Sequence, residues 1–196
     1  MVFEYRADIL QLLVSPAHAY FGRSKDGPAD DVRTDLVERV EIVANKGIRG
    51  DRFFGVKAHT EAAVTFLAVE AWEAVGDALA TEMPDTAVAR RNIVVRGIEL
   101  DPLRGVEFEL DSGDGPVRFR GGRPAHPCAW MDSMIVDGAR KALIGRGGLR
   151  AEPRTDGTLR TGPVIVRSPV ELDASKAAAQ VTRAQPQAAK PPLPMK

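Results

Sequence analysis

The chain has 196 residues, with 27 basic and 27 acidic residues and no net charge. This length is typical of one globular domain, and the lack of a basic excess or basic stripe argues against binding to nucleic acid or an anionic membrane surface. The first residues show no charged segment before a long apolar run, and no run of about 18 apolar residues occurs, so we expect a cytoplasmic protein without a membrane segment.

The first part of the chain predicts strands. Residues 9–14 form an apolar run that is typical of a buried strand, and residues 36–43 alternate in the way of a half-buried strand. Residues 15–35, between them, are rich in Gly, Pro and Asp. We expect a long loop there, and loops of this length are usually functional or disordered.

The middle of the chain predicts one helix among short strands. Residues 64–67 form a strand leading into residues 70–80, whose apolar positions have helical spacing. Further strands are expected at 92–95, 106–110 and 117–120. Because Gly, Pro and Asp separate these strands, the pattern favours a closed or nearly closed β-barrel over an alternating βαβ sheet.

The next residues complete a fold that is mainly β with a few helices. Residues 128–144 have a helical pattern, which Asp137-Gly138 is expected to split into two pieces. Asp156-Gly157 predicts a hairpin turn between its flanking strands. The remaining strands are expected at 149–154, 158–160 and 163–167.

The composition changes after Asp173. Residues 174–196 contain four prolines, four cations and no acid, so they cannot bury enough apolar surface to offset the entropy lost on ordering. We therefore expect one domain over residues 1–173, followed by a disordered tail.

Cys128 is the only cysteine in the chain, and it lies in His126-Pro127-Cys128-Ala129-Trp130 at the expected start of a helix. One interpretation is a small buried apolar side chain, the usual state of a free cysteine. The other is a reactive thiol, since the N–H groups at a helix start favour the thiolate and His126 is placed to accept the thiol proton. The histidines, His18, His59 and His126, fit no zinc-binding pattern with a single cysteine.

The segment Gly47-Ile48-Arg49-Gly50-Asp51-Arg52-Phe53-Phe54-Gly55 also has two interpretations. Its glycines favour a tight turn, because glycine tolerates positive φ. Alternatively, the loop presents Arg52, together with Arg49, to an anionic ligand, since a guanidinium binds phosphate through two parallel hydrogen bonds.

Further polar candidates stand beside predicted strands. Arg91 and Asn92 either close a turn against main-chain groups or, through the Asn92 amide, bind the polar edge of a ligand. Gly145-Arg146-Gly147-Gly148 lacks the Lys-Ser/Thr ending of a phosphate-binding loop, so it predicts a helix cap and turn. Arg146 remains a candidate pocket residue.

Taken in order, these segments resemble the MOSC domain, named for the C-terminal part of molybdenum cofactor sulfurase. The resemblance extends from about residue 8 to 168, and no single motif in it is decisive. It is carried by residues 47–55, Val64-Thr65-Phe66-Leu67, Arg90-Arg91-Asn92-Ile93-Val94-Val95-Arg96-Gly97-Ile98, Pro127-Cys128 and Gly145-Arg146-Gly147-Gly148-Leu149-Arg150.

The resemblance implies a MOSC-like β-barrel that binds the molybdenum cofactor, molybdopterin. Cys128 would ligate molybdenum, a soft thiolate being a reasonable ligand for such a metal, and Asp51 would orient Arg52. Arg91 and Asn92 match an Arg/Asn pair of the amidoxime-reducing members, although the family proline between them is absent here. The implied cofactor-binding set is Arg49, Asp51, Arg52, Arg91, Asn92 and Arg146.

The implied activity is reduction of an N-hydroxylated substrate. The sequence has no flavin fingerprint, ferredoxin-like cysteine set or pyridoxal-phosphate sulfurase portion, so electrons or sulfur would come from a partner protein. Two alternatives stay open: a non-catalytic carrier of persulfide or cofactor using Cys128, and a module that binds another small anion. The sequence does not predict the substrate or the oligomeric state.

Overall fold

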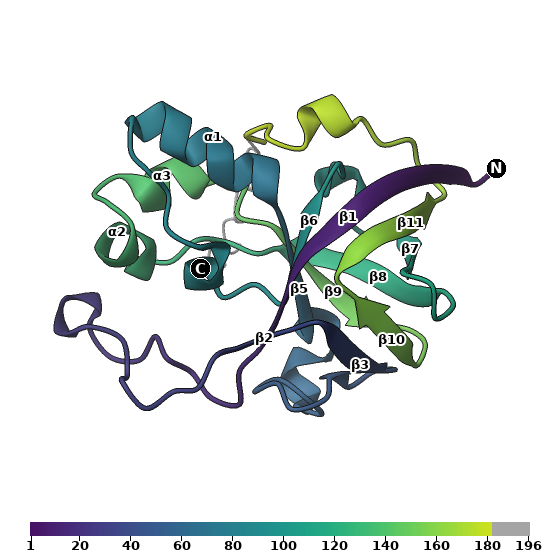
Figure 1. Ribbon diagram of the computed structural model, residues 1–196, viewed down its shortest axis with the longest axis horizontal. Helices are drawn as coiled ribbons and strands as arrows, with labels where there is room; N and C mark the ends of the chain where they lie inside the picture. The colour runs from purple at the N-terminus through teal and green to yellow at the C-terminus, as the bar shows by residue number, and fades with distance from the viewer. Residues whose placement is uncertain (182–196) are drawn as a thin grey trace, which may run out of the picture.

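The computed structural model describes residues 1–181, which form a mainly β fold around a closed seven-stranded barrel (Figure 1). The barrel order is β11-β7-β8-β9-β5-β6-β1, and it closes because β1 pairs with both β6 and β11. The barrel strands are β1 (Phe3–Val14), β5 (Val64–Ala68), β6 (Ile93–Arg96), β7 (Glu107–Asp111), β8 (Val117–Pro124), β9 (Leu149–Pro153) and β11 (Gly162–Ser168).

Strand β1 is longer than the sequence predicts, because it pairs with three neighbours in succession. Its first half runs antiparallel to β11, from Phe3 opposite Ser168 to Ile9 opposite Gly162. Its second half pairs with β6 and then with the short strand β2 (Asp35–Val37). The apolar run marks only the second half of the strand, in which residues 11–13 are buried in succession.

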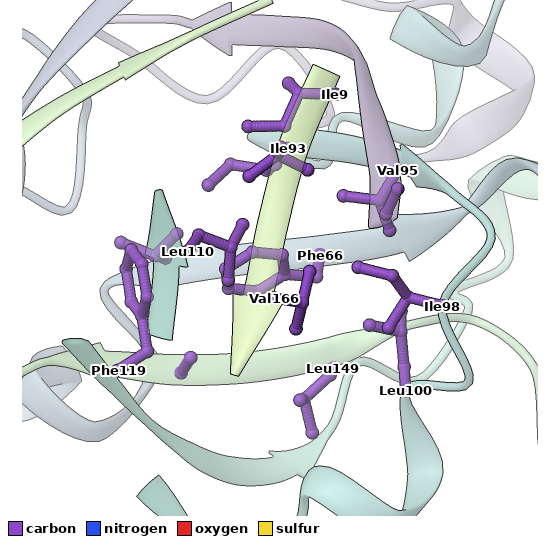
Figure 2. Close-up of a cluster of buried hydrophobic side chains, with 14 of the residues drawn as sticks. Ile9, Phe66, Ile93, Val95, Ile98, Leu100, Leu110, Phe119, Leu149 and Val166 are labelled. Atoms are coloured by element: carbon purple, nitrogen blue, oxygen red, sulfur yellow. The ribbon is translucent and has the colours of Figure 1, made fainter. Parts of the chain in front are cut away.

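The interior of the barrel is filled by inward-facing aromatic and branched side chains, as Figure 2 shows. Phe66 contacts Phe108 and Phe119, with ring centroids 5.7 and 5.3 Å apart. These residues are at most 2% exposed, and burying an aromatic ring of this size stabilises the fold by about 2–3 kcal/mol. The interior is therefore a packed core and leaves any ligand to bind outside the barrel wall.

Three helices cover one outer side of the barrel (Figure 1): α1 (Val69–Leu79), α2 (Trp130–Met134) and α3 (Ala139–Leu143). The buried positions of α1 recur at helical spacing, and the helix ends where Ala80 adopts a left-handed conformation. Trp72 and Trp130 pack in a second apolar cluster with Leu67 and Val94, which point out of the barrel wall. The expected division of residues 128–144 into two helices is confirmed. Within residues 1–181, no helix is long and apolar enough to cross a membrane.

A small separate sheet corrects two sequence predictions. Residues 36–43 are two strands, because β2 joins the barrel sheet while β3 (Arg39–Val43) pairs with β4 (Gly47–Ile48) and β10 (Gly157–Arg160). The hairpin predicted at Asp156-Gly157 is wrong. Strand β9 already pairs with β5 and β8, so β10 pairs with β3 instead.

Short 3-10 helices connect the strands. The last of these helices lies beyond the expected end of the domain at Asp173, so it corrects that boundary. Residues 174–181 continue the folded domain: Ala177 is buried in the core cluster, and the Val181 N–H donates to the Gly145 carbonyl at 3.1 Å. Residues 182–196 of the expected disordered tail lie outside the described residues. The 3-10 helices are η1 (Ser24–Asp26), η2 (Lys57–Ala62), η3 (Thr86–Ala89), η4 (Asp101–Leu103) and η5 (Ala174–Lys176).

Candidate functional site

The Asp51 carboxylate is the centre of a buried polar network where β1 ends and β5 and β6 begin. Its side chain is fully buried. Oδ2 accepts from the Ser15 N–H at 3.3 Å and from Asn92 Nδ2 at 3.0 Å, and Oδ1 accepts from the Phe53 N–H at 3.1 Å. Positive φ at Gly47, Gly50 and Gly55 gives this segment the tight turn that its glycines favour. This turn places the Asp51 side chain in the buried network.

Asn92 is fully buried and uses both sides of its amide inside the protein. Nδ2 donates to Asp51 and to the Leu13 carbonyl at 3.2 Å. Oδ1 accepts from the Thr65 N–H at 3.1 Å and from Thr65 Oγ1 at 2.8 Å. These bonds leave the amide no spare donor and no exposed edge. Asn92 therefore positions Asp51 instead of contacting a pterin, in contrast to the expectation from the sequence.

Arg52 retains unused binding capacity beside Asp51. Its side chain is 9% exposed, its guanidinium carbon lies 4.8 Å from the centre of the Phe53 ring, and Nη1 is 3.4 Å from Asp51 Oδ2. Nε is buried without an acceptor in residues 1–181. Burial lowers the pKa of Arg52, and the Asp51 charge opposes that shift. A buried guanidinium with an unsatisfied N–H is suited to an anionic partner.

Arg90 was not predicted as a site residue, yet it joins the long loop after β1 to the start of β6. It is 8% exposed and has a positive φ of 53°. Nη2 donates to Ser15 Oγ at 2.7 Å and to the Ala17 carbonyl, and Nη1 donates to Thr34 Oγ1 at 2.8 Å. Its guanidinium carbon also lies 5.6 Å from the centre of the Tyr20 ring. Through these contacts, Arg90 holds the loop after β1 in place.

Arg91 fixes the segment that carries Cys128. Its guanidinium donates only to main-chain carbonyls, those of Gly147 at 3.0 Å, Ala89 and Ala125 at 3.2 Å, and His126 at 3.4 Å. Burial, and to a smaller extent the nearby Arg150, lower the pKa of Arg91 to about 10. Arg91 therefore closes a turn against main-chain groups, which is one of the two interpretations of the sequence. No carboxylate in the described chain offsets its charge, so Arg91 also adds positive charge next to the Cys128 loop.

Cys128 is exposed, which excludes the interpretation as a buried apolar side chain. It directly precedes α2, and its carbonyl accepts from the Met131 N–H at 3.0 Å. The start of α2 is anchored because Trp130 stacks on Tyr20 at 4.9 Å. Burial raises the pKa of Tyr20 to about 12, with smaller effects from Arg90 and Cys128. The thiol is thus held on a fixed loop and open to solvent.

Cys128 and Arg52 share an electrostatic environment, although they belong to distant parts of the sequence. Both act on the pKa of Arg91, which Cys128 raises and Arg52 lowers. Arg52 and Arg90 also lower the pKa of His18, although burial is the larger cause. Arg91 is therefore a charge that both the thiol and the Arg52 guanidinium influence.

Two other predicted residues are not part of this site. Arg49 is exposed and pairs with Glu41 through Nε at 2.7 Å and Nη2 at 2.8 Å. Arg146 instead holds the C-terminal segment, with Nη1 donating to the Ala178 carbonyl at 3.4 Å and Nη2 to Gln180 Oε1 at 3.3 Å.

The histidines do not form a metal centre. His18 and His59 pack against Phe53, at 5.2 and 4.8 Å between ring centroids, while His126 is exposed near Cys128. Within residues 1–181, no three His, Cys, Asp or Glu side chains are grouped so that they could hold a metal ion. A metal at Cys128 would therefore need ligands from a bound cofactor.

The sequence analysis missed Ser15, Thr65 and Arg90. Thr65 is a polar residue in an otherwise apolar strand, which is a weak signal of a buried hydrogen bond. Ser15 and Arg90 gave no such signal, because their contact depends on how the loop of residues 15–34 folds back.

Comparisons with known proteins agree on the fold alone. No family model matches the chain, and no curated protein matches it. The crystal structure of the YUAD protein from Bacillus subtilis aligns with a TM-score of 0.67 and 14% sequence identity, covering 87% of this chain and 100% of that chain. The crystal structure of a hypothetical protein aligns with a TM-score of 0.51 and 15% identity, covering 86% and 75%.

Proposed function

We propose that this protein binds a molybdopterin-type cofactor, with the Cys128 sulfur as a ligand of molybdenum. The proposal is supported by the exposed thiol on a loop held by Arg91 and by the incompletely paired Arg52, both of which influence the pKa of Arg91. A soft thiolate suits such a metal, and a guanidinium suits the phosphate of a pterin cofactor.

The residues present fit this group in part. Cys128 and Arg52 still have groups that could bind a ligand. The polar groups of Asn92 and Arg91 already form hydrogen bonds within the protein. We therefore assign Asp51, Asn92 and Arg91 to positioning: the first two fix Arg52, and Arg91 fixes the Cys128 loop and contributes positive charge. MOSC membership is part of the same proposal.

Each residue has a defined task in this account. Cys128 holds the metal end of the cofactor and Arg52 binds its anionic end, while Phe53 covers one face of the Arg52 guanidinium. When bound, the cofactor would supply two-electron chemistry for reducing an N-hydroxylated substrate, with electrons from a partner protein. The exposed position of Cys128 leaves room for that partner and the substrate.

Metal and pterin analysis tests this function. The wild type and Cys128→Ser are produced in a host that makes the molybdenum cofactor, and molybdenum and pterin are measured per chain. We expect both in the wild type and a loss of molybdenum in Cys128→Ser with an unchanged thermal midpoint, because a hydroxyl is a harder and less acidic ligand. Equal molybdenum in the two proteins, or none in the wild type, contradicts the proposal.

The second candidate is a sulfur carrier, and the openness of the Cys128 loop favours it. Cys128 and its neighbours His126 and Ala129 are all exposed. The Cys128 thiolate would attack the outer sulfur of a donor persulfide, forming Cys128–S–SH and releasing the donor thiolate. This exchange needs no oxidant, because the persulfide sulfur is already oxidised.

Intact-mass analysis separates the two candidates. A carrier incubated with a cysteine desulfurase and cysteine gains the mass of one sulfur atom, which a reductant removes, and contains no stoichiometric molybdenum. A cofactor protein contains molybdenum without this labelling. Labelling that persists in Cys128→Ser excludes Cys128 as the carrier.

A further inference from the structure

A basic cavity of about 760 Å³ lies beside the Cys128 loop and plays no part in the proposed function. The loop between β8 and α2, the glycine-rich turn before β9 and the segment around η5 enclose it; in Figure 1 this segment is the yellow stretch beyond β11. Neither Cys128 nor Arg52 lines it. Its acidic residues are Glu99 and Asp101, and its basic residues are Arg104, Arg123, Arg140, Arg146, Arg150 and Lys176.

Two of these arginines, Arg123 and Arg150, lie close together in the lining. The pairing of β8 with β9 shifts register between Gly121 and Pro124, and this irregularity brings Arg123 near Arg150. Neither side chain has a salt bridge or hydrogen bond within residues 1–181. Burial lowers the pKa of Arg150, and Arg123 lowers it further. Arg150 is half-buried and Arg123 is exposed, and two like charges held close together favour an anion that binds to both.

Two more arginines have unsatisfied donors in the same lining. The Nε atoms of Arg104 and Arg146 are buried and have no acceptor in the described chain. An unpaired buried N–H of a charged group loses its solvation without compensation. The two come from separate elements, Arg104 after η4 and Arg146 before β9, and both residues line the cavity.

The two acidic side chains of the lining, Glu99 and Asp101, are fewer than its six basic side chains. Residues 182–196 contain Arg183, Lys190 and Lys196 and no Asp or Glu. Lys176 pairs with Asp173 at 3.2 Å, and Glu99 accepts from the Asp173 N–H at 3.0 Å, so these groups are already engaged. The excess of positive charge therefore points to an anion from outside the chain.

The cavity also has an apolar wall, formed by Ala68, Leu100, Pro124 and Leu149. Cavities of about 300–1,000 Å³ accommodate whole small molecules, so this one has room for more than a free phosphate ion. Apolar surface beside the arginines would bind the organic part of the ligand.

We propose that this cavity binds a small organic phosphate: Arg123 and Arg150 hold the phosphate from the strands, Arg104 and Arg146 add positive charge to the lining, and the apolar wall packs against the organic group. This site is distinct from Cys128, and the proposal stands whether or not the protein binds molybdopterin.

Isothermal titration calorimetry with phenyl phosphate and with inorganic phosphate tests this site. We expect phenyl phosphate to bind one site per chain, more tightly than inorganic phosphate because its ring contacts the apolar wall. Arg150→Gln and Arg123→Gln should each weaken binding by about tenfold or more, since each removes a charge-assisted hydrogen bond. Arg123 is exposed, so its substitution leaves folding intact, which the thermal midpoint checks.

Arg118→Gln is the matched control. Arg118 lies on the same strand as Arg123, but it is exposed and pairs with Glu109, outside the cavity. We expect this variant to bind within about twofold of the wild type, and Cys128→Ser to bind as the wild type does. The site is refuted if phenyl phosphate shows no saturable binding at millimolar concentration, or if Arg118→Gln weakens binding as much as Arg150→Gln. Loss of binding in Cys128→Ser would place the phosphate at the other site and also overturn the inference.

Discussion

Asn92 Nδ2 donates to the buried Asp51 carboxylate at 3.0 Å across 41 residues of sequence. This bond joins the glycine-rich turn after β4 to the start of β6, and Thr65 on β5 completes it by donating to Asn92 Oδ1. A buried carboxylate needs such donors, because it has left water. The arrangement therefore stabilises the barrel end and, through Asp51, fixes Arg52.

Removing this bond should destabilise the whole domain. Asn92→Ala leaves an Asp51 oxygen and the Thr65 N–H buried with fewer partners, and we expect a loss of about 2–4 kcal/mol in the free energy of unfolding. Urea denaturation measures it. Thr60→Ala, which removes an exposed hydrogen bond to the Lys57 carbonyl, should change it by less than about 0.5 kcal/mol. Equal stability of the two variants would show that the network contributes little.

The loop residues Arg49 and Arg52 make a matched pair, since only Arg52 is buried beside Asp51. In protein from a cofactor-producing host, we expect Arg52→Gln to lower the pterin content and Arg49→Gln to leave it unchanged. A fluorescence assay of oxidised pterin measures both. If the Arg49 variant loses pterin and the Arg52 variant keeps it, our assignment of the anion-binding residue is wrong.

The backbone at Gly148 lies so close to the Phe66 backbone that Gly148→Ala should strongly destabilise the fold. A Cβ at Gly148, where φ is +104°, would lie 2.0 Å from the Phe66 carbonyl oxygen, whereas Gly113 has φ +106° and open space. Gly113→Ala should cost about 1–2 kcal/mol from backbone strain, and Gly148→Ala at least about 2 kcal/mol more from the clash. Matching denaturation curves for the two variants would refute the close approach.

The segment after η5 should stabilise the domain. We compare a chain that ends at residue 181 with one that ends at residue 173. The shorter chain loses the buried Ala177 side chain and the acceptors of Arg146, so its thermal midpoint should be lower by about 3 °C or more. Identical midpoints would mean that residues 174–181 contribute nothing to stability.

The sequence predicted those parts of the fold that depend on local pattern. Short strands, their turn residues and the apolar face of α1 identified a barrel with few helices, because periodicity records which side of an element is buried. The prediction of a hairpin at Asp156-Gly157 was wrong. Turn residues do not show whether β9 has a free edge with which β10 could pair. The packing of Ala177 was missed because the composition of residues 174–196 as a whole does not show that one small side chain reaches the core.

The candidate site was predicted less completely, for a physical reason. The residue types at Asp51, Arg52, Asn92 and Cys128 are visible in the sequence, but the difference between Arg49 and Arg52 depends on which of them meets Glu41. The role of Asn92 depends on hydrogen bonds to three distant segments. Such long-range contacts leave no local periodicity.

Protection of the Cys128 thiol tests the central claim most directly, that this sulfur is the ligand of a bound cofactor. The rate of iodoacetamide alkylation at Cys128 is measured by mass spectrometry in protein from a cofactor-producing host and from a host that cannot make the cofactor. Because the thiol is exposed, we expect rapid alkylation in the cofactor-free protein and strong protection, in proportion to molybdenum content, in the loaded protein. Equal alkylation rates in molybdenum-containing and molybdenum-free protein would contradict the account.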